Sequence, residues 1–173
     1  MSPSGGANPI YFPNVDEITP LAVAFAQMMF AHSAFEREVR ELADVITGVY
    51  GFGEKRQNQW SAPTRPGRMA KLISKHRGAI PEAEPIKTIL TEAIRTCFDR
   101  DLLAHGEWWR FDPDTSTIDV RGGTQWTRGL VPHKPWTRAD IMAVTEKFKN
   151  LQAALYKFRH AIKERTPLRS GAR

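Results

Sequence analysis

The chain has little cysteine, with only Cys97 among its 173 residues. A single cysteine cannot form an internal disulfide or one of the paired-cysteine motifs that bind metals. No stretch approaches the roughly 20 uninterrupted apolar residues of a membrane-spanning helix. The first residues, MSPSGGANP, also lack the basic and apolar regions of a secretory signal. We therefore expect a cytoplasmic protein that does not associate with a membrane.

The sequence also lacks several common catalytic motifs and any repetitive segment, and its composition suits one globular domain. The sequence contains no phosphate-binding glycine loop, no serine elbow, no internal repeat and no low-complexity tract. Its 41% hydrophobic and 25% charged residues are typical of a globular protein, and its length suits one domain. We expect a flexible leader over residues 1–17, a single domain over 18–166 and a basic tail over 167–173.

The net charge of +6 is concentrated in two segments. Residues 51–78 carry seven Lys or Arg and one acid, Glu54, while residues 157–173 carry six and one acid, Glu164. Such segments favour a polyanionic partner such as RNA, because neutralised phosphates release counterions, although a solvated surface is the alternative. Trp60 lies in the first segment and could stack on an unpaired base. The cations that we expect to bind RNA are Lys55, Arg56, Arg65, Arg68, Lys71 and Lys75.

Apolar residues at heptad spacing predict a long first helix. We expect it to begin at Thr19 and Pro20, because a hydroxyl N-cap followed by proline is a common helix start. It should end near Gly48 or Gly51. The apolar face of this helix consists of Leu21, Phe25, Met28, His32, Phe35, Val39, Leu42 and Ile46.

A second long helix is predicted near the end of the sequence. Thr137 and Asp140 form a pattern like a capping box, and the helix should stop before Pro167. Its apolar face comprises Ile141, Val144, Phe148, Leu151, Leu155, Phe158 and Ile162. Two long helices with matching apolar faces must pack together, which favours a helix bundle.

Shorter elements are predicted between these two helices. Residues 69–76 suggest a short helix, and residues 86–98 suggest a third full one, with Glu82 and Glu84 favourable near its start. Residues 48–66 read as a long polar loop. Apolar and charged residues alternate in 109–111 and in 118–120, on either side of a segment rich in turn residues, and this pattern predicts a β-hairpin. The expected fold is all-α, an up-and-down bundle of about four helices with a small β-hairpin inserted before the last one.

The segment Asp99-Arg-Asp-Leu-Leu-Ala-His105 holds the candidate catalytic residues. On a helix, Asp101 and His105 share a face, so the carboxylate could accept one ring N–H and raise the pKa of the imidazole. Arg100 lies about 140° around an ideal helix from His105. The two could converge if the helix kinks or starts afresh, if the arginine curls back, or if a second copy of the chain contributes its own pair.

Arg100-Asp-Leu-Leu-Ala-His105 resembles the Arg-polar-x-x-x-His motif of HEPN domains. These are α-helical bundles of bacterial toxins, phage-defence proteins and RNA-processing nucleases. The resemblance implies a metal-independent endoribonuclease, usually a homodimer, that needs no cofactor. This chain departs from the family at Asp101, where Asn is commonest.

The resemblance also implies roles for three residues. His105 takes the proton of a ribose 2′-hydroxyl or protonates the leaving oxygen, while Arg100 holds the charge that develops on the phosphoryl oxygens. Asp101 positions His105. Such cleavage leaves a 2′,3′-cyclic phosphate. An antitoxin or another defence-system protein is a possible further partner.

Other interpretations of these residues stay open. The chain could be a non-catalytic HEPN-like dimeric interaction module that binds a protein or nucleotide. Arg100 and Asp101 could form a surface ion pair while His105 packs beneath Trp108 and Trp109. A metal site at Asp101, His105 and Glu107 is disfavoured because no second histidine lies within a turn. His32 could be a core histidine or a catalytic partner that faces His105.

Overall fold

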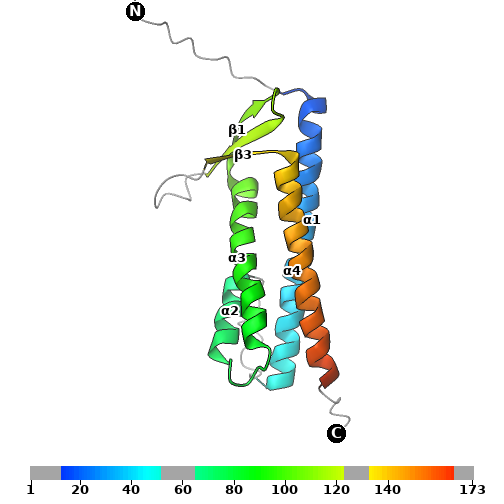
Figure 1. The fold of residues 1–173 in the computed structure, drawn as a ribbon, viewed down its shortest axis with the longest axis vertical. Coiled ribbons are helices and arrows are strands. Elements are labelled where there is room, and N and C mark those ends of the chain that lie inside the picture. The colour runs from blue at the N-terminus through cyan, green and yellow to red at the C-terminus, as the bar shows by residue number, and fades with distance from the viewer. Residues whose placement is uncertain (1–12, 52–64, 123–132, 166–173) are drawn as a thin grey trace, which may run out of the picture.

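The computed structural model describes residues 13–51, 65–122 and 133–165. These residues form four helices and one small antiparallel sheet, which precedes the last helix (Figure 1). The elements in chain order are α1 (Val15–Tyr50), α2 (Pro66–Lys75), α3 (Ala83–His105), β1 (Glu107–Asp112), β2 (Thr117–Arg121), β3 (His133–Trp136) and α4 (Arg138–Arg165). The predicted helical fold with a β insertion is confirmed at this level.

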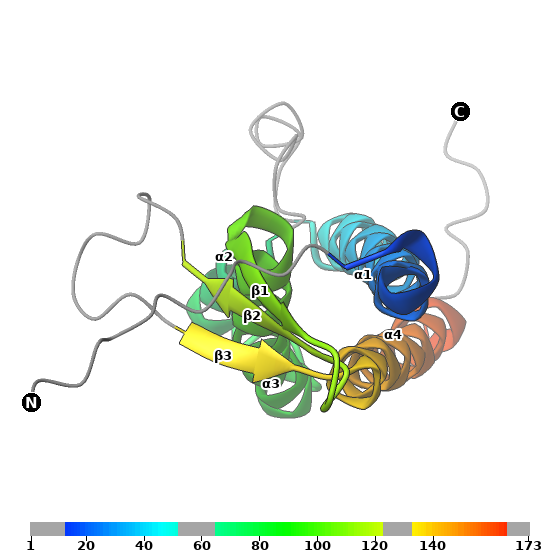
Figure 2. The ribbon, with the colours of Figure 1, turned by 90° about the horizontal axis from the view of Figure 1, so that it is seen from above.

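The two longest helices, α1 and α4, lie side by side and run in the same direction, while α3 runs in the opposite direction (Figure 1). The contact between α1 and α4 is the most extensive one between helices. The short helix α2 packs along the first part of α3. Viewed from above, the sheet covers the end of the bundle at which α3 finishes (Figure 2). The core therefore lies between the helices, and the sheet closes one end of it.

The start of α1 differs from the prediction. The helix begins at Val15, and its N-cap is Asn14 rather than Thr19. The Asn14 side chain accepts from the Glu17 backbone N–H at 3.0 Å, and the Glu17 carboxylate accepts from the Asn14 N–H at 2.9 Å. This capping box satisfies two otherwise unpaired donors, whereas the Thr19 hydroxyl donates to the Val15 carbonyl inside the helix. Residues 15–17, expected in the leader, belong to α1.

The predicted apolar face of α1 is confirmed. Every residue of that face is buried except Phe25, which is half-buried. The helix ends at Tyr50, and Gly51 follows with φ 66°, in the left-handed conformation that glycine adopts at little cost. Its N–H donates to the Thr47 carbonyl at 3.0 Å. Residues 48–50, expected in a loop, therefore complete the helix.

By length and composition α1 is long and apolar enough to cross a membrane. The core helix of a soluble protein passes the same test, and one face of α1 contributes to the hydrophobic core. Its buried face carries Glu38, which accepts two hydrogen bonds from Arg159 of α4, at 2.5 and 3.2 Å. Because a buried carboxylate needs such a partner, this ion pair ties α1 to α4.

The third helix forms as predicted, but two of its apolar residues do not enter the core. Ile94 and Phe98 are 44% and 47% exposed, while Leu102 and Leu103 are buried. Glu82, at the N-cap, makes no side-chain capping bond and instead pairs with Arg165 of α4. The predicted short helix corresponds to α2.

The predicted hairpin is part of a three-stranded sheet with the order β1-β2-β3. The strand β3 is not among the predicted elements, and its Pro135 cannot donate to a ladder hydrogen bond. The proline is tolerated because β3 is an edge strand, where Pro135 lies opposite Asp119. Trp136, fully buried, lies opposite Ile118 and joins the sheet to the core.

Candidate functional site

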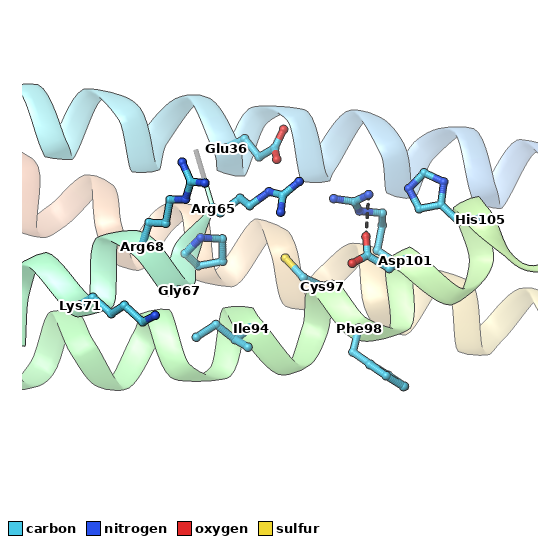
Figure 3. Close-up of a pocket in the computed structure, with 12 residues that line it drawn as sticks. Glu36, Arg65, Gly67, Arg68, Lys71, Ile94, Cys97, Phe98, Asp101 and His105 are labelled. Atoms are coloured by element: carbon cyan, nitrogen blue, oxygen red, sulfur yellow. Dashed lines mark ion pairs between the residues drawn. The ribbon is translucent and has the colours of Figure 1, made fainter. Parts of the chain in front are cut away.

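A cleft of about 960 Å³ lies between α1, α2 and α3. Figure 3 shows that its side chains come from facing helices, with Glu36 on α1, Arg68 and Lys71 on α2, and His105 at the end of α3. The ionisable residues that line it are Glu36, Arg65, Arg68, Lys71, Cys97, Arg100, Asp101 and His105, and the others are Pro66, Gly67, Ile94 and Phe98.

The structure brings together six of the predicted site residues. Three come from the basic segment and three from the Arg-x-x-x-x-His motif: Arg65, Arg68, Lys71, Arg100, Asp101 and His105. Lys75 is exposed on α2 but does not line the cleft. Lys55, Arg56 and Trp60 lie outside the described residues. Four cations and two carboxylates line the cleft, so it carries an excess of positive charge.

Arg100 reaches the cleft from a continuous helix. α3 runs without interruption from Ala83 to His105, so no new helix starts at Arg100. Its guanidinium turns to two partners: Nη1 lies 2.7 Å from Oδ1 of Asp101, and Nη2 lies 2.9 Å from Nε2 of His32. The long side chain thus lets Arg100 and His105 line one cleft within a single chain.

His32 is a core histidine, and its ring contacts the cleft residue Arg100. Its ring is buried and packs edge-on against Phe148 with 5.0 Å between ring centroids. Burial, together with the nearby Arg100 guanidinium, lowers the pKa of His32 from 6.5 to about 4. His32 is therefore neutral at physiological pH. Since a guanidinium only donates, Nε2 of His32 accepts and its proton is on Nδ1.

Asp101 and His105 differ from the expected arrangement. Asp101 pairs with Arg100, and within the described residues no hydrogen bond joins it to His105. The ion pair between Arg100 and Asp101, which belonged to the alternative interpretation, is present, but His105 is exposed rather than packed beneath the tryptophans. Trp108 instead packs edge-on against Phe25 of α1 and donates to the Leu103 carbonyl at 2.9 Å.

Two further groups in the cleft have perturbed pKa values. Burial raises the pKa of the Cys97 thiol to about 11 despite the nearby Arg100, so this cysteine stays protonated and is a poor nucleophile. Burial also raises the pKa of Glu36, although Arg100 and Arg40 oppose that shift. Glu36 lies 3.6 Å from Nε2 of His32, measured from its Oε1 atom.

Sequence reasoning did not identify Glu36, Ile94 or Phe98 as cleft residues. A four-residue spacing does place Glu36 beside His32 on α1, but only the packing of α1 against α3 brings both to Arg100. Ile94 and Phe98 belong to the apolar residues at helical spacing that predict the helix over 86–98, and such spacing cannot distinguish a core face from the wall of a cleft.

Within residues 13–51, 65–122 and 133–165, no group of three or more His, Cys, Asp or Glu side chains is placed to hold a metal ion. Comparisons of the chain with protein-family models, with curated proteins and with solved structures found no match. The functional conclusion therefore depends on the cleft itself.

Proposed function

We propose that this protein binds RNA in the cleft between α1, α2 and α3 and cleaves it there as a metal-independent endoribonuclease. One observation supports this proposal above all: cations from α2 and α3 meet an exposed histidine along a single cleft. These residues are Arg65, Arg68, Lys71, Arg100 and His105. Guanidinium and ammonium groups bind phosphate, and an imidazole ring can accept or donate a proton in general acid–base catalysis.

The proposed reaction uses the RNA's own hydroxyl as the nucleophile. The ribose 2′-oxygen attacks the adjacent phosphorus, and the bond from phosphorus to the 5′-oxygen breaks. His105 accepts the hydroxyl proton or donates a proton to the leaving oxygen, while Arg100 balances the charge on the phosphoryl oxygens. The products are a 2′,3′-cyclic phosphate and a 5′-hydroxyl.

The cleavage experiment compares variants of the two motif residues on a short single-stranded RNA. We expect His105→Ala and Arg100→Ala each to lower the rate about a hundredfold or more, with products that end in cyclic phosphate and activity that persists in EDTA. His160→Ala, on α4 outside the cleft, is the matched control. Melting curves establish that each variant is folded. Sensitivity to EDTA, or a wild-type rate in folded His105→Ala, would refute the nuclease.

Binding is measured separately with a 2′-O-methyl RNA, which lacks the attacking hydroxyl. Changing Arg65, Arg68 and Lys71 to Gln should flatten the slope of log affinity against log salt by about 0.7 for each phosphate that is no longer bound. Arg95→Gln removes a cation that is 77% exposed on α3 outside the cleft and serves as the control. An unchanged slope in the triple variant would mean that α2 is only a solvated surface.

A second function has one observation in its favour. Asp101 already pairs with Arg100 at 2.7 Å, which reduces the charge available to a phosphate. The alternative is a HEPN-like interaction module that binds a nucleotide or protein without cleaving RNA. Binding that depends on the cleft cations, with no cleavage by the wild type, would favour it. Both functions suit a cytoplasmic protein of a toxin–antitoxin or phage-defence system, in which an antitoxin is a possible partner.

A further inference from the structure

The two partners of Arg100 differ in accessibility and charge. His32 is buried, belongs to α1 and lies 68 residues away in the chain. Asp101 is the next residue on α3, and its side chain is 40% exposed at the cleft. The first contact is fixed by the packing of two helices, whereas the second joins neighbouring residues and exposes its carboxylate to solvent, where an ion pair contributes less to stability than it does in the interior.

The charge of each partner decides what Arg100 can do. Asp101 neutralises the guanidinium. His32, whose Nε2 accepts the hydrogen bond as a neutral ring, holds the guanidinium without cancelling its charge. An arginine fixed by a neutral acceptor therefore keeps its full attraction for an anion and has already lost much of its rotamer freedom. Phe148, packed against the ring of His32, keeps this acceptor in place.

We propose that His32 is the positioning residue of the phosphate site: it holds the Arg100 guanidinium in the cleft while an incoming phosphate displaces Asp101. This inference rests on the proposed function. The guanidinium has five donors, of which His32 uses one at Nη2, so the donors at Nη1 released by Asp101 become available to phosphate oxygens. His32 does not itself contact the RNA or the reacting atoms.

The charged groups around this contact come from all three helices of the cleft. Glu36 and Arg40 approach from α1, Arg65 from the start of α2, and Asp101 from α3. Glu36 is the nearest carboxylate to His32, at 3.6 Å from Nε2. An RNA phosphate that enters the cleft therefore meets the guanidinium groups of three arginines and two carboxylates. Of these two carboxylates, Asp101 is the one that pairs directly with Arg100.

The first experiment tests the position of Arg100 without RNA. Nitrogen-15 NMR of the arginine side chains should show slowly exchanging guanidinium N–H signals from Arg100 in the wild-type protein. His32→Gln retains a neutral acceptor and should preserve these signals, whereas His32→Leu should abolish them. His160→Leu, at a half-buried histidine stacked on Tyr156, is the control and should leave them unchanged. Melting curves identify variants that fold.

The second experiment measures binding of 2′-O-methyl RNA. We expect affinity to fall about tenfold to a hundredfold in His32→Leu, which is the size expected for a hydrogen bond to a charged group, and to be rescued largely by His32→Gln. Asp101→Asn should bind more tightly than the wild type, because no carboxylate then competes for Arg100. Wild-type affinity in a folded His32→Leu would overturn the inference.

Failure of the proposed function gives a different pattern. If the wild type binds no RNA but the Arg100 signals still depend on His32, the RNA site is wrong and the positioning contact is right. If His32→Leu does not fold, His32→Gln decides alone: disappearance of the Arg100 signals in that folded variant would overturn the role of a neutral acceptor. Weaker RNA binding by Asp101→Asn would overturn the displacement of Asp101.

Discussion

His32 shows at the scale of one residue how burial and a neighbouring cation act together. The ring has little contact with water, and the Arg100 guanidinium lies against its Nε2 atom. Both effects disfavour the imidazolium, and together they lower the pKa of His32 from 6.5 to about 4. A histidine on an apolar helix face is thus a neutral hydrogen-bond acceptor in this protein.

This shift predicts how stability depends on pH. Between about pH 6.5 and about pH 4, the unfolded chain binds a proton at His32 that the folded chain does not. The free energy of unfolding should therefore fall as pH is lowered through this window, by at most about 1.4 kcal/mol for each pH unit. Above pH 6.5 His32 is neutral in both the folded and the unfolded chain, so it does not lower the free energy of unfolding. Below pH 4 it is protonated in both states, and the loss of stability that it causes has reached its full size.

The measurement is urea denaturation over a series of pH values for the wild type and His32→Gln. The raised pKa of Glu36 acts in the opposite direction, since its folded form holds a proton more tightly than the unfolded chain does. The comparison with His32→Gln isolates the histidine. We expect the variant to lose stability less steeply between pH 6.5 and 4, and equal slopes would contradict a buried neutral His32.

At the scale of elements, Gly106 joins α3 to β1 and thereby decides where His105 lies. Its N–H donates to the Leu102 carbonyl at 2.8 Å, which closes the last turn of α3. A Cβ atom at this position would lie 2.6 Å from the carbonyl oxygen of Arg121 and 2.7 Å from Val120, and would also overlap the Leu102 carbonyl. Only glycine permits β2 to approach the helix end this closely.

We therefore expect Gly106→Ala to destabilise the protein by about 1–3 kcal/mol, the usual cost of overpacking. The backbone atoms that meet the new Cβ cannot simply rotate away. Gly48→Ala provides the control, because nothing lies within 4 Å of a Cβ at that helical position, and it should stabilise α1 by about 0.5–1 kcal/mol. Urea denaturation measures both. An equal effect of the two substitutions would show that the close approach is not retained in solution.

At the scale of the whole molecule, the cleft is bordered by apolar side chains that the core does not use. Ile94 and Phe98 line it from α3 and are each nearly half exposed. Phe30, on α1, is 78% exposed but does not line the cleft. An exposed apolar group beside a polar cleft suits an interface between two copies of the chain, since a twofold axis presents the same surface twice.

We predict a homodimer that forms through the surface of α3 beside the cleft. Sedimentation at micromolar concentration should show two chains per particle for the wild type, and Phe98→Asp should shift it to one chain because a charge is then buried at the interface. Phe30→Asp is the matched control and should remain dimeric. A monomeric wild type, or dissociation caused by Phe30→Asp alone, would contradict this prediction.

Much of the fold could be predicted because helical periodicity is a local signal. The apolar faces of α1 and α4 and the Thr137–Asp140 cap, with its bonds of 2.7–3.1 Å, follow from neighbours within a few residues. Two elements were predicted incorrectly, namely the start of α1 and the strand β3. Asn14 with Glu17 caps α1 more completely than Thr19, and the proline of β3 hid an edge strand.

The sequence by itself determined which segments become helices, which faces of α1 and α4 are buried, and that Arg100, Asp101 and His105 lie near the end of one helix, since these depend on spacing along the chain. Only the tertiary structure decided the partners of Arg100. Contact with His32 requires α1 and α3 to pack side by side, and the meeting of Arg65 with Arg100 requires α2 to fold back on α3. Such contacts join residues far apart in the sequence, and a local pattern does not predict which distant residues will come together in space.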